Sequence, residues 1–175
     1  MTPPQDAVGA QGPLLGIDVG TVRVGVAASD ARGVLAVPVT TVRRGGGDVA
    51  AIARLARERG ATGLVVGLPL TLSGQEGPAA QAIRAFAVRV ARRVAPTPVR
   101  LVDERLTTAG ASRGLRDAGL STKQARHVVD QVAAAAILQG GLDMSRSAGA
   151  PVGELVEAPP TRTTTQTDDT DETRT

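Results

Sequence analysis

Apolar residues form short runs in the first part of the chain and recur at longer, helical periods after it. Three runs of strand length come first, separated by short turns that contain glycine, and they cover 13–19, 22–29 and 34–42. Connections this short join antiparallel strands, so the pattern predicts a three-stranded meander. Pro38 has no N–H to donate to a ladder, which places the third strand at an edge of the sheet.

From residue 48 onward, amphipathic helical patterns alternate with two further apolar strands. The predicted helices cover 48–60, 78–94, 107–119 and 121–141, and the predicted strands cover 62–68 and 98–104. Right-handed crossovers would then place the first strand near the centre of the sheet. The predicted fold class is α/β: a five-stranded mixed sheet, made of the antiparallel meander plus two parallel strands and flanked by helices.

The two ends of the chain differ in composition from the part between them. Residues 1–12 are typical of a flexible N-terminal arm, and residues 143–175 are rich in threonine, proline and acids. Residues 151–175 alone hold six acids and two arginines, a composition typical of disordered segments. We therefore expect one folded domain over 13–142 and a disordered acidic tail over 143–175.

Composition excludes several classes of protein. The chain has one phenylalanine and no tryptophan or tyrosine, which argues against a binder that stacks bases on several aromatic side chains. It has no cysteine and a single histidine, His127, so thiolate and multi-histidine zinc sites are excluded. No signal-peptide pattern begins the chain and no apolar run approaches the length of a membrane span. We expect a cytoplasmic protein with no membrane partner.

Positive charge is concentrated outside the C-terminal tail. Residues 1–150 hold 18 basic and 11 acidic side chains, and nearly all of the basic ones are arginine. The guanidinium group suits phosphate oxygens, so this balance fits a nucleic-acid or nucleotide partner. Ordinary surface charge explains the same numbers equally well at this point.

Asp18 stands alone in a run of aliphatic residues and glycines, "LLGIDVG". Burying an isolated carboxylate is costly unless another group compensates the charge. Strand alternation puts Asp18 on the same face as Gly16 and Gly20, with Arg23 of the next strand near it. Two interpretations follow: Asp18 pairs with Arg23, or the glycines clear room for a ligand beside Asp18.

Two further carboxylates can reach the same region. Glu104 follows a predicted parallel strand in "VDERLTT", and ligands of such sheets gather at strand C-termini. Asp130 lies in "HVVDQVAAAAIL", beside the stripe predicted to be buried, which consists of Val128, Val129, Val132 and Ala136. Each of the two alone is also typical of a solvated surface acid.

Three clustered carboxylates would need a cation, because like charges raise one another's pKa. Without cysteine and with one histidine, oxygen-ligated Mg²⁺ is the natural ion, with Mn²⁺ as the alternative. Metal ions held by carboxylates beside a phosphate favour phosphodiester cleavage.

Four motifs, "GIDVGTVRVGVAASD", "VVGLPLTLSGQEGPAA", "VDERLTT" and "DQVAAAAIL", resemble in order and spacing the YqgF (RuvX-like) family over residues 13–142. The resemblance implies an RNase H-like fold and a Mg²⁺-dependent endonuclease that processes the 5′ end of pre-16S rRNA in ribosome biogenesis. Its expected partners are pre-16S rRNA or another structured RNA or DNA, together with ribosomal particles.

The same resemblance implies roles for individual residues. Asp18, Glu104 and Asp130 would be both the catalytic residues and the metal ligands. The loop at Gly67 and Pro69 would lie near the substrate.

Two arginines and the histidine have implied roles as well. Arg23 and Arg105 would contact the scissile phosphate or orient the carboxylates. His127, one turn before Asp130, is either a fourth ligand or proton carrier, or a surface residue.

Three other functions stay open. A Holliday junction resolvase would use the same chemistry on structured DNA. A non-catalytic RNA or ribosome binder could use the basic helix faces that carry Arg84, Arg89, Arg92 and Arg93. "DVGTVRVGVA" also resembles the phosphate loop of the actin and sugar-kinase group, but those proteins close two such domains around a nucleotide and are therefore longer.

Overall fold

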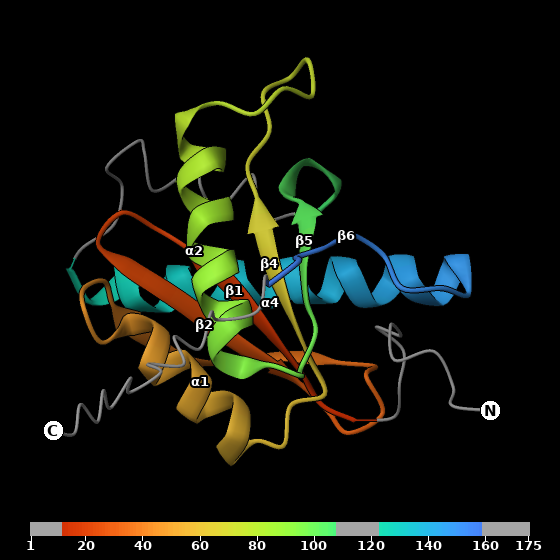
Figure 1. The fold of residues 1–175 in the computed structure, drawn as a ribbon. Helices are drawn as coiled ribbons and strands as arrows, with labels where there is room; N and C mark the ends of the chain where they lie inside the picture. Colours follow the sequence, from red (N-terminus) through yellow and green to blue (C-terminus); the bar gives the residue numbers. More distant parts are fainter. Residues whose placement is uncertain (1–11, 108–122, 159–175) are drawn as a thin grey trace, which may run out of the picture.

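The computed structural model describes residues 12–107 and 123–158 (Figure 1). Its elements follow the predicted order, with a short strand added at the end. They are β1 (Leu14–Val19), β2 (Arg23–Ser29), β3 (Ala36–Arg43), α1 (Asp48–Glu58), β4 (Gly63–Leu68), α2 (Pro78–Val94), β5 (Val99–Asp103), the 3₁₀ turn η1 (Glu104–Leu106), α4 (Lys123–Ala148) and β6 (Glu154–Leu155). The helix predicted over 107–119 lies outside the described residues, except for Thr107 itself.

The strands form one mixed sheet in the order β3-β2-β1-β4-β5-β6. The meander β1-β2-β3 is antiparallel, and β1, β4 and β5 run parallel to one another. The predicted arrangement is confirmed, including the central place of β1 and the edge position of β3. The sheet has six strands, however, because β6 adds two residues antiparallel to β5. A strand this short has no alternation for sequence analysis to detect.

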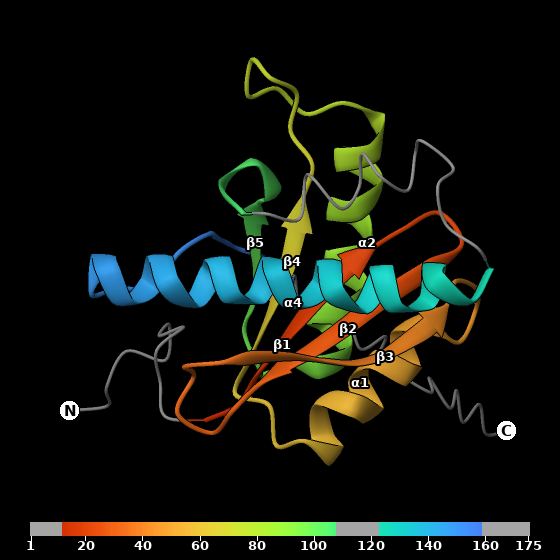
Figure 2. The ribbon, with the colours of Figure 1, turned by 180° about the vertical axis from the view of Figure 1, so that it is seen from behind.

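Helices cover the two faces of the sheet unequally. Helices α1 and α2 lie on one face, as Figure 1 shows, and their apolar side chains form a large core with the strands. Of the helices in the described ranges, α4 alone crosses the other face, as seen from behind in Figure 2. It packs close to β1 at Gly16, where an added Cβ would lie 2.6 Å from the Cβ of Leu138. The missing side chain therefore sets how near α4 comes to the sheet.

The last helix of the domain predicted over 13–142 is longer in the structure than the sequence pattern indicates. Helix α4 does not stop at Gly140-Gly141 but continues to Ala148, and β6 then joins the sheet. Gly140 has a packing role instead, since a Cβ there would lie 2.5 Å from Cγ2 of Thr107. Residues 143–158 thus belong to the fold, and the rest of the predicted tail lies outside the described residues.

Within the described ranges, no helix combines the length and the apolar character that crossing a membrane requires.

Candidate active site

Asp18 occupies the central strand, and glycines of both neighbouring strands lie beside it. It is 1% exposed and pairs across the ladder with Gly25 of β2. On its other side, Gly67 of β4 comes directly after Val66, the partner of Ile17. The two missing side chains leave space on the α4 face of the sheet at the level of Asp18.

The space at Gly25 is filled by the backbone of α4. A Cβ on Gly25 would overlap the carbonyl oxygen of Asp130. The space at Gly67 is filled by two side chains, since a Cβ there would lie 2.5 Å from Cδ1 of Ile137 and 2.6 Å from Oε1 of Glu104. Asp18 therefore lies between Gly25, against which Asp130 packs, and Gly67, against which Glu104 packs.

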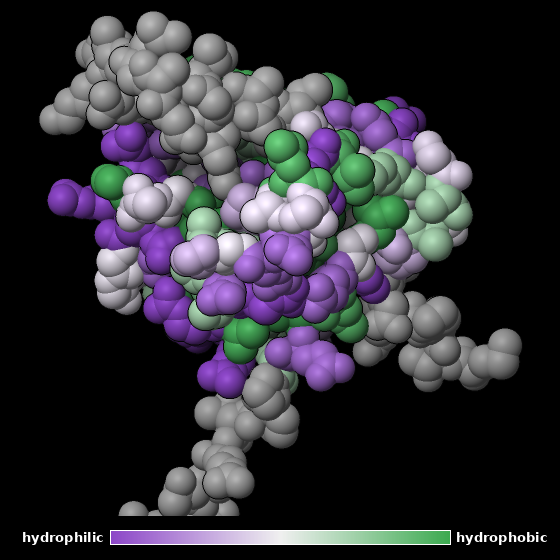
Figure 3. All heavy atoms as spheres, turned by 90° about the horizontal axis from the view of Figure 1, so that it is seen from above, coloured by the Kyte–Doolittle hydropathy of each residue, from purple (hydrophilic) through white to green (hydrophobic). Residues whose placement is uncertain are grey.

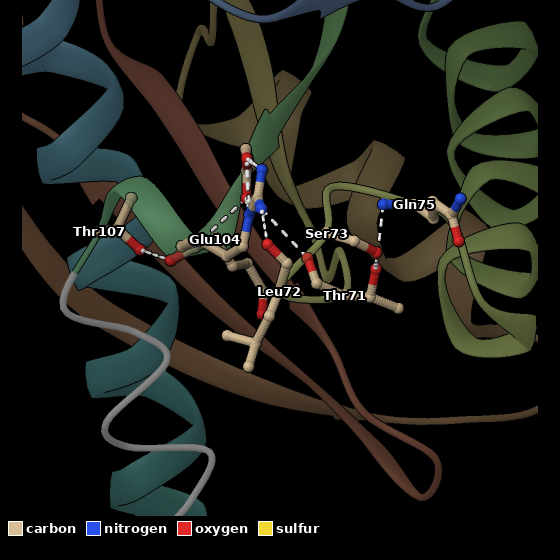
Figure 4. Close-up of polar contacts among 8 residues, drawn as sticks. Thr71, Leu72, Ser73, Gln75, Glu104 and Thr107 are labelled. Atoms are coloured by element: carbon tan, nitrogen blue, oxygen red, sulfur yellow. Dashed lines mark hydrogen bonds and ion pairs between the residues drawn. The ribbon is translucent and has the colours of Figure 1, made fainter.

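Glu104 reaches this place because it is the first residue after β5. The parallel strands β4 and β5 end side by side, so the side chain of Glu104 extends over Gly67 and is 4% exposed. The turn that follows is closed by Thr107, whose N–H and Oγ1 donate to the carbonyl of Glu104 at 3.1 and 3.0 Å (Figure 4). These bonds fix the backbone from which the carboxylate projects.

Asp130 comes from α4 and has its own counter-ion. Nε of Arg23 donates to Oδ2 of Asp130 at 2.9 Å, and the side chains are 22% and 7% exposed. The described contacts thus pair Arg23 with Asp130, one of the three acids, in keeping with the implied role of orienting a carboxylate.

The buried stripe of α4 also differs from the predicted one. Val128 is 60% and Val132 45% exposed, whereas Asp130 is 5% exposed and lies on the buried side with Ala134 and Ile137. The sequence pattern places Asp130 beside the predicted stripe, where it faces neither clearly inward nor outward. Asp130 can face the sheet because Arg23 supplies a positive charge there.

The three acids lie against one row of the sheet, Asp18 within it, the backbone of Asp130 over Gly25 and the side chain of Glu104 over Gly67, but they do not form a finished metal site. In the ranges 12–107 and 123–158, no group of three acidic, histidine or cysteine side chains is arranged to hold a metal ion. The donor set nevertheless fits a hard divalent cation, because it consists of carboxylate oxygens. Side-chain rotation would have to complete the coordination.

Arg105 contacts Asp103 and the loop that follows β4. Its guanidinium pairs with Asp103 at 2.7 Å and donates to the carbonyls of Thr71 and Leu72 at 3.1 and 3.2 Å (Figure 4). The hydrogen bonds from Arg105 hold the pKa of Asp103 below its usual value. No described contact joins Arg105 to the three acids, so it braces the loop that follows β4.

That loop, residues 69–77, begins at Pro69 and is fixed at several points. Leu70 forms a single bridge with Glu76, and Gly74 turns the chain with φ +82°, a conformation that favours glycine. Glu76 pairs with Arg84 of α2, and this contact lowers the pKa of Glu76. Gly67 itself lies inside β4, so only Pro69 of the two predicted substrate residues is in the loop.

Sequence reasoning missed the apolar tip of this loop. Leu72 is 100% exposed, and Figure 4 shows its side chain pointing away from the polar contacts that brace the loop. The only sequence signal is a leucine placed inside a turn. His127 is also at the surface, and its described contact is a backbone one, in which its carbonyl accepts from Thr41 at 3.1 Å.

Polar side chains gather at the end of the sheet where these elements meet. Seen from above in Figure 3, hydrophilic residues predominate on the left, the side on which Figure 1 places the turn between β1 and β2.

Comparison with known proteins gives consistent matches. A family model described as "RuvX: Holliday junction resolvase" matches residues 12–144. A relative from Nocardioides sp. strain JS614 is 57% identical over 151 residues, which cover 83% of this chain and 97% of the relative. A relative from Thermobifida fusca is 51% identical over 156 residues, which cover 85% and 98%. Both bear the name "Putative pre-16S rRNA nuclease".

A solved structure confirms the predicted RNase H-like fold. Thermus thermophilus RuvC in complex with a Holliday junction substrate matches with a TM-score of 0.52 at 15% identity. The match covers 80% of this chain and 98% of that one.

Proposed function

The chain belongs to the RuvX family, and from this membership and the site geometry we propose that it is a divalent-metal-dependent endonuclease. Its proposed substrate is structured RNA, in particular pre-16S rRNA, free or within a ribosomal particle. The observation that carries the proposal is that Asp18, Glu104 and Asp130 come from three different elements and all lie against the same row of the sheet, at Gly25, Asp18 and Gly67. The names of relatives at 51–57% identity favour RNA over a four-way DNA junction.

Asp18, Glu104 and Asp130 would hold the metal ion, for which we propose Mg²⁺, with Mn²⁺ as the alternative. Such an ion polarises a phosphate and offsets the negative charge that develops in the transition state. Asp18 is the fixed member of the set, because it lies on the central strand, 1% exposed and held by ladders on both sides. The other two acids come from a strand end and a helix, where side chains have more freedom to adjust.

Arg23 would have two tasks in this site. It neutralises Asp130 in the protein without substrate, through the contact of 2.9 Å. When a phosphate arrives, the partly exposed guanidinium can bind it, since its fork fits two phosphate oxygens. Arg105 would act at a distance by holding the loop from Pro69 onward beside the bound strand.

The test is a cleavage assay with Asp18→Asn, Glu104→Gln and Asp130→Asn on pre-16S rRNA fragments and on four-way DNA. We expect each variant to lose cleavage while nucleic-acid binding persists, and we expect a chelator to abolish the activity of the unmodified chain. Asp143→Asn is the matched control, because Asp143 lies on α4 but is exposed and paired with Arg146. Cleavage that survives in Asp18→Asn would contradict the proposed site, and faster cleavage of DNA junctions than of RNA would favour the resolvase function.

A further inference from the structure

Two arginines face each other beside the site, on neighbouring strands of the meander. Arg23 of β2 and Arg43 of β3 are direct partners in the ladder. Next along the same face, Gly25 contacts the backbone of Asp130 and Thr41 donates to the carbonyl of His127. Both arginines therefore project from the α4 face of the sheet, which also carries the three acids.

Like charges directly opposite each other in a sheet are destabilising, so this pair needs an explanation. The charge of Arg23 is offset by Asp130 at 2.9 Å. The next arginine, Arg44, forms an ion pair with Asp48 at 3.1 Å, and its guanidinium lies 4.6 Å from the centre of the Phe86 ring. Arg43 is exposed, and within the described ranges it makes no ion pair. Nothing described in the fold gains from a positive charge at this position.

We propose that Arg43 is a phosphate-binding residue that holds the nucleic-acid backbone on the β3 side of the three acids. The proposal rests on the function proposed above and extends it to the path of the substrate. Strand β3 is two strands from β1, roughly 10 Å across the sheet, so Arg43 would bind a phosphate next to the reacting one and not that phosphate itself. A phosphate anion there also relieves the repulsion between Arg43 and Arg23.

The first test measures how binding depends on salt. The two proteins compared are the single variant Asp18→Asn, which should not cleave, and the double variant that also carries Arg43→Gln. Their Kd for a labelled pre-16S rRNA hairpin is measured by fluorescence anisotropy over a range of salt concentrations. We expect roughly three- to tenfold weaker binding and a slope of log Kd against log salt that falls by about one. Arg43→Lys should keep most of the slope, because it keeps the charge.

Arg32→Gln is the matched control. Arg32 is exposed in the turn that joins β2 to β3, at the end of the hairpin away from the site, and its replacement removes the same charge. We expect this variant to keep the slope. In chains that retain Asp18, we expect Arg43→Gln to raise the KM for RNA more than it lowers the cleavage rate at saturating RNA, because the proposed role of the residue is in binding.

A second readout concerns the free protein. Removing one of two facing charges should raise the Tm of Arg43→Gln by about 1–3 °C, with no such rise in Arg32→Gln.

Two results would overturn the role of Arg43. The first is an equal slope of log Kd against log salt for Arg43→Gln and Arg32→Gln, even if the loss of cleavage in Asp18→Asn supports the proposed function. A lowered Tm with binding weakened equally at every salt concentration would overturn it too, since Arg43 would then be structural. Failure of the unmodified chain to bind or cleave RNA would instead reject the proposed function.

Discussion

The two faces of strands β1, β2 and β4 differ in composition: the face toward α1 and α2 is aliphatic, and the face toward α4 carries Asp18 and two glycines. Toward α1 and α2, the central strands present Ile17, Val24 and Val66, each 0% exposed within one aliphatic core. One residue further along each strand, the α4 face presents Asp18, Gly25 and Gly67. Because side chains alternate, one strand can supply stability on one face and chemistry on the other. The expected effects of substitution should therefore differ sharply between adjacent residues.

The largest expected effect is that of Asp18→Asn on cleavage. We expect at least about a thousandfold loss of rate, because the fixed ligand of the proposed ion loses its charge. The free energy of unfolding should change little, since asparagine keeps the shape of aspartate and the core face of β1 is untouched. Rate measurements and urea denaturation of one preparation test both parts. A large loss of stability would break the comparison between the faces.

The neighbouring substitution Ile17→Ala should show the opposite behaviour. The residue is fully buried in the core, so we expect a loss of about 2–5 kcal/mol in the free energy of unfolding. Cleavage per folded molecule should remain within a few fold of that of the unmodified chain. Urea denaturation with an assay at a temperature where the variant is folded checks this. Loss of activity in the folded variant would show that the core face also shapes the site.

Gly25→Ala sharpens the comparison by adding one carbon atom to the site face. The new methyl group would meet the backbone of Asp130, which cannot move without shifting α4. We expect a cost of about 1–3 kcal/mol together with reduced cleavage, measured by denaturation and rate. Gly46→Ala is the control, because a Cβ there meets nothing within 4 Å, and it should be nearly neutral. Similar results for the two would show that the close contact of α4 is not needed.

The smallest effect on stability should come from Arg105→Gln, at the edge of the site. Hydrogen exchange at Thr71 and Leu72 should become faster, and the KM for RNA should rise several fold, because the loop loses its brace. The pKa of Asp103 is lowered by Arg105 in the folded protein, so the ion pair stabilises above the ordinary value of 3.8 and is lost as the pH falls below it. The difference in Tm between the variant and the unmodified chain should accordingly disappear in acid. Unchanged exchange in the loop would contradict the bracing role.

Sequence analysis predicted the parts of the fold that follow from apolar periodicity and chain crossing. The central place of β1 and the edge position of Pro38 are examples. Asp18 could be singled out because a lone carboxylate in an aliphatic strand is costly, and Glu104 because it follows a parallel strand. Each of these inferences needs only local sequence and a general rule of sheet construction.

The errors have a common cause, which is that tertiary contacts changed the meaning of a residue. An aspartate in a helix is typical of a solvated position, but Asp130 is buried because it pairs with Arg23, which lies over a hundred positions away in the chain. Gly140 reads as a helix end, but it makes room for Thr107. The contacts of Arg105 with the carbonyls of Thr71 and Leu72 could not be predicted, because the sequence does not reveal the shape of the loop that supplies them.

The continuity of α4 limits how the proposed ion can be captured. This helix of 26 residues contacts β3 through His127 and Thr41, and its Gly141 lies near Val102 of β5. Between these two places, the backbone of α4 lies directly against Gly25 of β2. Such a helix cannot tilt at Asp130 without lifting contacts along its whole length. We therefore expect the proposed cation to be bound by rotation of the carboxylate side chains, while the backbones of α4 and of the sheet stay in place.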